Sequence, residues 1–228
     1  MFNSSLGKKY WMAVTGAFLM FFVVAHLLGN LQMFLGPEWM NGYAKHLEEL
    51  PLILWPMRVL LATALLLHMV LGLWLGVENM RSRPKRYAVN GTIRASLVSR
   101  MMVFLGLAIF CFIVFHLLHF TLDVIDPSIT GLKDAKGRQD VYSMVVLAFQ
   151  DPKILAVYVT AIFFLSAHLR HGGYSFLQSL GLLKESHLPM AKRMALFFAI
   201  LIFLGYNSIA VASYTGYLKP LSGAAHRA

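Results

Sequence analysis

The stretch MMVFLGLAIFCFIVFHLLHFTL, residues 101–122, decides the fold of this chain. It contains no Asp, Glu, Lys or Arg, and as a helix rising about 1.5 Å per residue it is long enough to cross about 30 Å of bilayer hydrocarbon. Four more apolar stretches of at least this length lie at residues 10–35, 52–77, 154–183 and 194–218. The sequence therefore predicts an all-α membrane protein with five transmembrane helices.

The composition agrees with a membrane bundle. Of the 228 residues, 58% are hydrophobic and 13% are charged, which is not the composition of a soluble globular protein. Five spans leave short loops and no room for a separate catalytic domain, so residues 1–228 are predicted to form a single membrane domain. The first span lacks a small-residue cleavage site, and we interpret it as a retained helix. Within the long polar stretch 123–153, the apolar residues 141–149 predict a short surface helix.

The basic residues predict the orientation. The net charge of +10 could indicate nucleic acid, but basic residues beside spans more often set topology. They gather on one side, which we assign to the cytoplasm together with the N-terminus, as expected for a multi-pass protein of a bacterial inner membrane: Lys8, Lys9, Arg81, Arg83, Lys85, Arg86, Arg94, Arg100, Lys184, Lys192 and Arg193. A basic docking face for another subunit is compatible with this pattern.

Histidine is the metal ligand that the chain has in quantity. The single cysteine, Cys111, excludes an internal disulfide, a thiolate zinc site, an iron–sulfur cluster and covalent haem attachment through a C-x-x-C-H motif. Nine histidines are present, and six of them lie within the spans: His26, His68, His116, His119, His168 and His171. A lone membrane histidine is often an interhelical hydrogen bond, but at least one in each of the first four spans favours a bound cofactor.

Depth counting groups four of these histidines into two levels. From cytoplasmic ends at residues 10 and 100, His26 and His116 lie about 24 Å up their helices, towards the outer surface. From exits near residues 80 and 179, His68 and His168 lie about 17 Å from the cytoplasmic side. Two imidazoles at one depth in a four-helix bundle are typical of a b-type haem with both axial positions filled. The spacing predicts two stacked haems in the bundle of the first four helices, with electron transfer as their role.

Several neighbouring residues have a predicted role beside these haems. Gly72 and Gly172 follow His68 and His168 by four residues, so each lies one turn away on the same helix face; they either admit a flat macrocycle or allow close helix packing. Gly16 and Gly106 each precede an outer-level histidine by ten residues.

His119 and His171 compete as ligands, since each lies three residues beyond His116 or His168. The depths of His119 and His171 in the membrane match those of the opposite histidines less well than the depths of His116 and His168 do. We place His119 near an outer quinone or haem propionate, and Arg170 and His171 near the inner haem's propionates or a partner surface. Solvated or headgroup roles are the alternative.

Four segments in order resemble one known family. They are FFVVAHLLGN at 21–30, LLLHMVLGLWLG at 65–76, FCFIVFHLLHFT at 110–121 and FLSAHLRHGGYSF at 164–176. Together they resemble the di-haem cytochrome b membrane anchor of succinate:quinone oxidoreductase, that is, succinate dehydrogenase or fumarate reductase. The resemblance covers about residues 9–217.

The resemblance implies haem b held by His26 and His116 distal to the cytoplasm and by His68 and His168 proximal to it. It also implies partner subunits on the cytoplasmic face, a flavoprotein with FAD and an iron–sulfur protein, which carry the dicarboxylate chemistry. Electrons would pass between these subunits and a membrane quinone, typically menaquinone. Such an anchor belongs to the respiratory chain and the tricarboxylic acid cycle, and a higher oligomer is compatible with it.

Family members can place a carboxylate in the first outer loop near the quinone, and Glu48 or Glu49 falls in the matching region, where either could relay protons, with His119 as a further candidate. The alternative is a solvated loop acid. Certain fumarate-reducing relatives carry a carboxylate two residues before the fourth-helix ligand, where this chain has Ser166. The difference slightly favours succinate oxidation as the direction.

Two other function classes remain. A formate dehydrogenase or hydrogenase anchor also uses intramembrane histidines, although the distribution over helices one to four fits it less well. A metal or proton-coupled transporter would bind and exchange ions, but the sequence shows no inverted repeat and few intramembrane acids.

Overall fold

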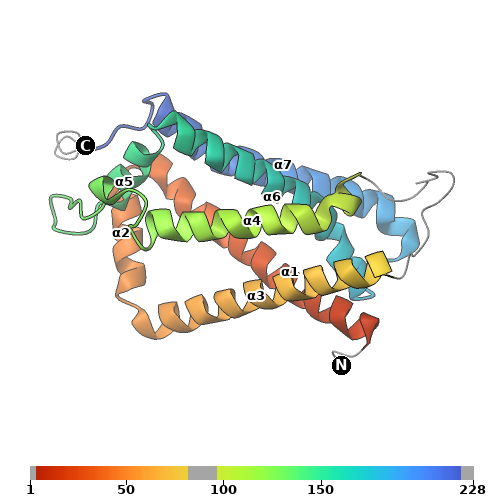
Figure 1. The fold of residues 1–228 in the computed structure, drawn as a ribbon. Helices are drawn as coiled ribbons and strands as arrows, with labels where there is room; N and C mark the ends of the chain where they lie inside the picture. Colours follow the sequence, from red (N-terminus) through yellow and green to blue (C-terminus); the bar gives the residue numbers. More distant parts are fainter. Residues whose placement is uncertain (1–3, 82–96, 222–228) are drawn as a thin grey trace. The chain divides into compact units, whose positions relative to one another are not determined.

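The computed structural model describes residues 4–81 and 97–221, with side chains from residue 101 in the second range. Within these residues every regular element is a helix, apart from an isolated bridge between Lys133 and Gln139. Figure 1 traces the elements in chain order: α1 (Ser5–Asn30), η1 (Leu31–Leu35), α2 (Pro37–Glu48), α3 (Pro51–Arg81), α4 (Leu97–Phe120), η2 (Pro127–Ile129), α5 (Val141–Ala148), α6 (Pro152–Ser179), η3 (Glu185–His187) and α7 (Leu188–Tyr214).

Five of the helical segments are long and apolar enough to cross a membrane, which confirms the predicted all-α, membrane-type architecture. They cover Ser5–Leu35, Pro51–Arg81, Met101–Phe120, Pro152–Ser179 and Glu185–Tyr214. Large apolar side chains such as Phe21, Trp55, Phe104 and Leu204 are exposed on them, as expected for helices whose outer surface meets lipid.

Local signals set the helix ends close to the predicted positions. Pro51 and Pro152 begin α3 and α6, where the missing backbone N–H of proline costs nothing. Gly181 has φ +72° and ends the run after α6, with the N–H of Leu182 bonded to the carbonyl of Leu177 at 2.9 Å. The predicted span 154–183 is therefore too long at its C-terminal end.

The chain divides into two compact units. Unit 1 comprises Met1–Phe22, Leu60–Phe110 and Phe164–Ile200, and unit 2 comprises Val23–Val59, Cys111–Phe163 and Leu201–Ala228. Each of the five long helices contributes one segment to each unit, so the division passes through helices and not through a linker. Unit 1 holds the helix ends that the charge pattern assigns to the cytoplasm. The basic residues predicted at 83, 85, 86 and 94 lie outside the described residues.

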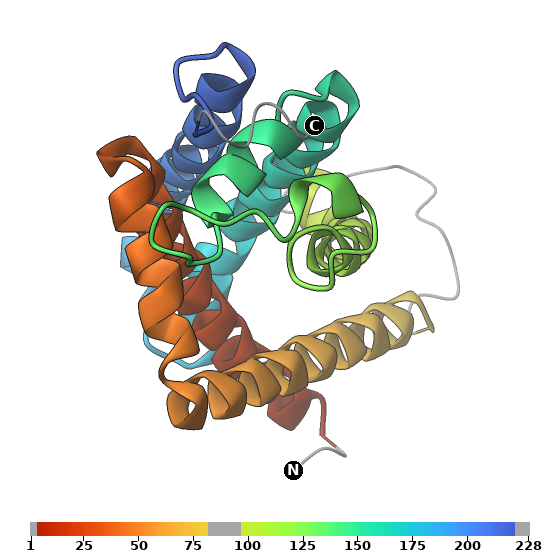
Figure 2. The same cartoon turned by 90° about the vertical axis from the view of Figure 1, so that its left-hand side faces the viewer.

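In unit 2, the short helix α5 is at the centre of the core and not at the surface. Tyr142, Val145 and Val146 of α5 are buried and pack with residues of η1, α2, α6 and α7. The prediction of a helix here is confirmed, but its description as a surface helix is wrong, because six of its eight residues are buried. Helix α5, in green, and the connection that leads to it from α4 face the viewer in Figure 2.

Candidate functional site

The two histidines predicted at the inner level meet inside unit 1. His68 of α3 and His168 of α6 have ring centroids 6.2 Å apart, with their planes at 72°. The Nδ1 atom of His68 lies 3.1 Å from the carbonyl oxygen of Met12 and 3.3 Å from the hydroxyl of Thr15. An Nδ1–H donated to the Met12 carbonyl leaves Nε2 of His68 as the nitrogen with a lone pair for a ligand.

A glycine of α1 makes room for the His68 ring. A Cβ atom at Gly16 would lie 2.9 Å from Cε1 of His68, which is closer than such contacts occur. A Cβ at Gly106 would lie 3.7 Å from Cε1 of His168. In the sequence these glycines were associated with the outer histidines, but both lie against the inner pair.

Gly72 and Gly172, predicted either to admit a macrocycle or to allow close helix packing, border open space. A Cβ at Gly72 would meet only the sulfur of Met12, at 4.0 Å, and a Cβ at Gly172 would meet nothing within 4 Å. The backbone is therefore accessible beside both residues, in the same unit as His68 and His168.

The two histidines predicted at the outer level meet inside unit 2. His26 of α1 and His116 of α4 have ring centroids 6.0 Å apart, with their planes at 82°. The Nδ1 atom of His116 lies 3.2 Å from the hydroxyl of Tyr158. The ring of Tyr206 lies 6.2 Å from that of His26, and its hydroxyl donates to the Val23 carbonyl at 2.8 Å. Tyr158 and Tyr206 are neighbours that the sequence analysis missed, since only the packing of α6 and α7 in unit 2 brings them to the histidines.

Both separations fit two imidazoles on opposite sides of one metal ion. When each ring nitrogen is about 2 Å from the ion, the two ring centroids are about 6 Å apart. Among the described residues there is no group of three or more His, Cys, Asp or Glu that could hold a metal ion. Two imidazoles therefore suffice to bind a metal ion only when a further ligand, such as a porphyrin, fills the remaining coordination positions of that ion.

The competing histidines have other partners. His119 is fully buried, stacks on Phe120 with ring centroids 4.2 Å apart, and has its Nδ1 atom 3.0 Å from the Tyr158 hydroxyl. Its Nε2 atom has no hydrogen-bond partner among the described residues. His171 has its Nδ1 atom 2.9 Å from the hydroxyl of Tyr174. Neither ring is paired with another histidine in the described contacts.

Two further predicted neighbours of the inner histidines differ in burial. Arg170 is exposed, whereas Ser166, two residues before His168, is buried and its hydroxyl has no partner among the described residues.

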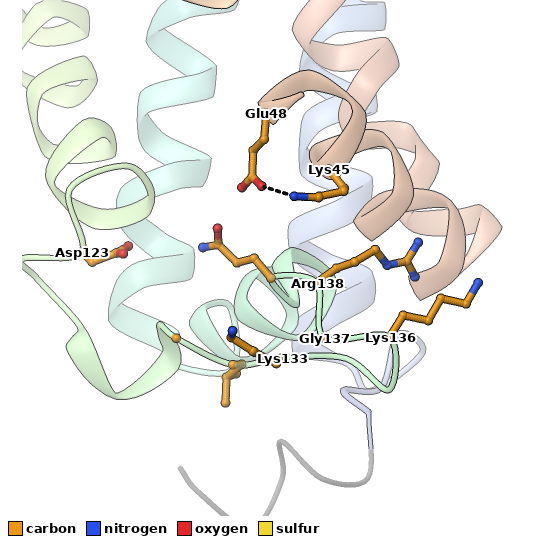
Figure 3. Close-up of a pocket in the computed structure, with 10 residues that line it drawn as sticks. Lys45, Glu48, Asp123, Lys133, Lys136, Gly137 and Arg138 are labelled. Atoms are coloured by element: carbon orange, nitrogen blue, oxygen red, sulfur yellow. Dashed lines mark ion pairs between the residues drawn. The ribbon is translucent and has the colours of Figure 1, made fainter. Parts of the chain in front are cut away.

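The carboxylates of the loop predicted to lie on the outer side are at the end of α2. The Nζ atom of Lys45 lies 3.7 Å from Glu48 and 4.0 Å from Glu49. Glu48 lines a pocket of about 530 Å³, shown in Figure 3, into which its side chain points. Glu49 and His119 are not among the pocket's lining residues. The described contacts therefore do not bring the three predicted relay residues together.

The pocket is strongly charged. Its ten lining residues are Lys45, Glu48, Asp123, Gly131, Leu132, Lys133, Lys136, Gly137, Arg138 and Gln139. Asp123 has φ +56°, an uncommon conformation for a residue with a side chain, and its Oδ1 atom is buried with no partner among the described residues. Such walls suit water and ions better than the apolar ring and tail of a quinone.

An ion-pair network holds the cations at the pocket rim. Glu38 accepts from Arg138 at 2.8 Å and from Lys136 at 2.6 Å. The hydrogen bond from Arg138, followed by that from Lys136, holds the pKa of Glu38 below its ordinary value. Burial raises the pKa of Asp134, but hydrogen bonds from the side chain and backbone of Arg138 and from the backbone of Lys136 outweigh it, so that the pKa is lowered. Both acids therefore keep their charge at neutral pH.

Comparison of the chain with protein-family models, with curated proteins and with solved structures finds no match.

Proposed function

We propose that this chain is the di-haem cytochrome b anchor of a succinate:quinone oxidoreductase. The observation that carries the proposal is the pairing of imidazoles: His68 with His168 at 6.2 Å and His26 with His116 at 6.0 Å between ring centroids. The four histidines that the sequence selects by depth are the same four that pair. Each pair would hold one haem b, which would supply reversible one-electron transfer between iron(III) and iron(II).

The surrounding side chains support a role in electron transfer and not in substrate activation. Each histidine pair would supply two imidazole ligands to one haem, which would leave no ligand position for oxygen or substrate. The Nδ1 contacts of His68 with Met12 and of His116 with Tyr158 orient one ring of each pair, as hydrogen bonds behind metal-bound histidines do. The protein would therefore hold the rings still while the charge on the iron changes.

The orientation of the chain is part of the proposal. The basic residues flanking the spans favour an N-terminus in the cytoplasm of a bacterial cell. A flavoprotein and an iron–sulfur protein would then dock at the helix ends of unit 1 that carry these basic residues. Reporter enzymes fused after residue 221 test this orientation, because five spans would place that residue on the side opposite to Ser5.

For the quinone reaction, we propose Glu48 as the proton-relay residue of the outer loop in preference to Glu49. A quinone that gains or loses two electrons also exchanges two protons, and these need a polar route to water. Glu48 lines the charged pocket while Glu49 does not. The carboxylate would pass protons between that pocket and menaquinone bound deeper in the protein.

The optical spectrum of the purified chain tests the haem assignment. We expect reduced b-type bands and two haems per chain from extraction and quantification of the pigment. A preparation from haem-replete cells with one haem or none would contradict the assignment of two pairs.

Co-purification identifies the complex. We expect a flavoprotein and an iron–sulfur protein to accompany the chain, and succinate to reduce both haems and a quinone. If formate or hydrogen reduces them and succinate does not, the chain is instead the anchor of a formate dehydrogenase or hydrogenase type of complex.

A further inference from the structure

A single hydroxyl group lies between two histidines of helix α4. The Tyr158 oxygen, on α6, is 3.2 Å from Nδ1 of His116 and 3.0 Å from Nδ1 of His119. Tyr158 is 7% exposed and His119 is fully buried. The three side chains form a hydrogen-bonded chain, in which only His116 belongs to a histidine pair.

Aromatic rings surround this hydroxyl chain. Four phenylalanine rings lie with centroids 5.0–6.0 Å from that of Tyr158: Phe112, Phe115, Phe120 and Phe149. Apolar rings offer no hydrogen bonds that could replace those within the chain. The arrangement of protons among the three polar groups therefore follows from the groups themselves.

The number of protons on the three groups decides which group donates in each hydrogen bond once His116 binds a metal. A tyrosine hydroxyl has one proton to donate and accepts through its oxygen. With Nε2 of His116 on iron, Nδ1 carries the proton and donates it to the Tyr158 oxygen. The Tyr158 proton is then donated to Nδ1 of His119, and His119, as a neutral ring, carries its own proton on Nε2.

We propose that Tyr158 is a positioning residue for the distal haem, which it also holds at a lower midpoint potential. This inference rests on the proposed function. By accepting a hydrogen bond from the Nδ1–H of His116, the hydroxyl raises the basicity of Nε2. A more basic ligand stabilises iron(III) over iron(II). His119 contributes because its Nδ1 accepts a hydrogen bond from the Tyr158 hydroxyl. This bond keeps the lone pairs of the Tyr158 oxygen turned to His116.

Unit 1 contains a matched control. His171 follows His168 by three residues, as His119 follows His116, and its Nδ1 atom lies 2.9 Å from the hydroxyl of Tyr174. The Nδ1 atom of His168, however, has no hydrogen-bond partner among the described residues. Tyr174→Phe therefore removes a tyrosine hydroxyl bonded to a histidine of the same spacing, without removing a bond to a paired histidine.

The test is a reductive titration of the purified chain, followed by the absorbance of each haem. In Tyr158→Phe we expect the potential of the distal haem to rise by about 59 mV, which corresponds to about a tenfold larger reduction constant. The proximal potential should stay unchanged. In Tyr174→Phe the distal potential should equal that of the unmodified chain, and in His119→Leu it should rise by less than in Tyr158→Phe.

The outcomes separate this inference from the proposed function. An unmodified chain without haem contradicts both. Two haems with unchanged potentials in Tyr158→Phe contradict the inference alone, as does a distal potential that moves equally in Tyr158→Phe and Tyr174→Phe. If Tyr158→Phe loses its distal haem, the His119→Leu variant decides. A raised distal potential in His119→Leu supports the inference, and an unchanged distal potential overturns it.

Discussion

The Nδ1 atom of His68 lies 3.1 Å from the backbone carbonyl oxygen of Met12, and the two residues are on different helices, α3 and α1. A backbone carbonyl cannot change with the side chain at its position, so this orientation of the imidazole is independent of residue identity at 12. His116 instead relies on the side chain of Tyr158. The contact that orients His68 therefore depends on the backbone, whereas the contact that orients His116 can be removed by a mutation at Tyr158.

Under the proposed function, replacement of a paired histidine should remove one of the two haems and leave the other. Both members of each pair lie in the same unit, so His68→Ala or His168→Ala should lower the haem content from two to one per chain, with the distal haem retained. Pyridine haemochrome absorbance measures the ratio. His187 is exposed on η3, and His187→Ala is the control that should keep both haems. Retention of two haems in His68→Ala would rule out this pairing.

Gly16→Ala should damage the proximal site without a change at any histidine. The new Cβ would lie 2.9 Å from Cε1 of His68, so the ring or the helix must shift, and we expect this shift to disturb the contact of His68 with the Met12 carbonyl. Loss of such an orienting contact weakens metal affinity by about 10–100-fold, so under the proposed function we expect the proximal site to fill last when haem is titrated into the apoprotein.

The control for this change is Gly42→Ala, on helix α2. Its Cβ would meet only the flexible guanidinium of Arg138, at 3.4 Å. This variant should bind both haems as the unmodified chain does. Equal haem affinity of Gly16→Ala and Gly42→Ala would show that the contact at His68 is unimportant.

Glu38 should make stability depend on pH in the acid range. Its pKa is lowered in the folded protein by Arg138 and Lys136, so its contribution is fully present above the ordinary value of 4.5 and is lost as the pH falls through the lower folded value. Glu38→Gln should lower the Tm at pH 7, and the difference from the unmodified protein should shrink as the pH falls below 4.5.

Thermal unfolding in detergent at several pH values measures this difference. Glu185 is exposed on η3 and has no ion pair among the described residues. The Tm of Glu185→Gln should follow that of the unmodified protein at every pH. A Tm difference for Glu38→Gln that persists unchanged into acid would contradict the ion-pair explanation.

Asn41→Ala should destabilise unit 2. Asn41 is 1% exposed, donates to the Asp140 carboxylate at 3.0 Å and accepts from the backbone N–H of Tyr142 at 2.9 Å. Its loss leaves buried polar groups unpaired, at a cost of about 2–4 kcal/mol. Denaturant unfolding measures this, with Gln150→Ala as the exposed control, for which we expect a change within about 0.5 kcal/mol.

The long helices could be predicted from the sequence because hydrophobic length is a local property. The span predicted at 101–122 corresponds to α4, which ends at Phe120, and the span predicted at 52–77 corresponds to α3 at Pro51–Arg81. Helix α2 was not predicted, since Pro37–Glu48 has too few apolar residues to be recognised as a span or as a buried helix. Its place depends on α5, against which it packs.

The candidate site also has features that could be predicted from the sequence and features that could not. Counting along each helix was enough to group His26 with His116 and His68 with His168, because depth depends only on rise per residue. The contacts of Gly16 with His68 and of Tyr158 with His116 were not predictable, since they depend on how each helix is rotated about its axis.

The sequence by itself determined the number of membrane-type helices and the level of each histidine along its helix, since both depend on residue type and spacing within one segment. Only the tertiary structure decided which imidazole nitrogen has a protein partner, which glycine makes room for a ring, and that Glu48 lines a pocket while Glu49 does not. These facts depend on side chains from different helices meeting at a few ångströms, and such meetings are fixed by packing between segments that are far apart in the chain.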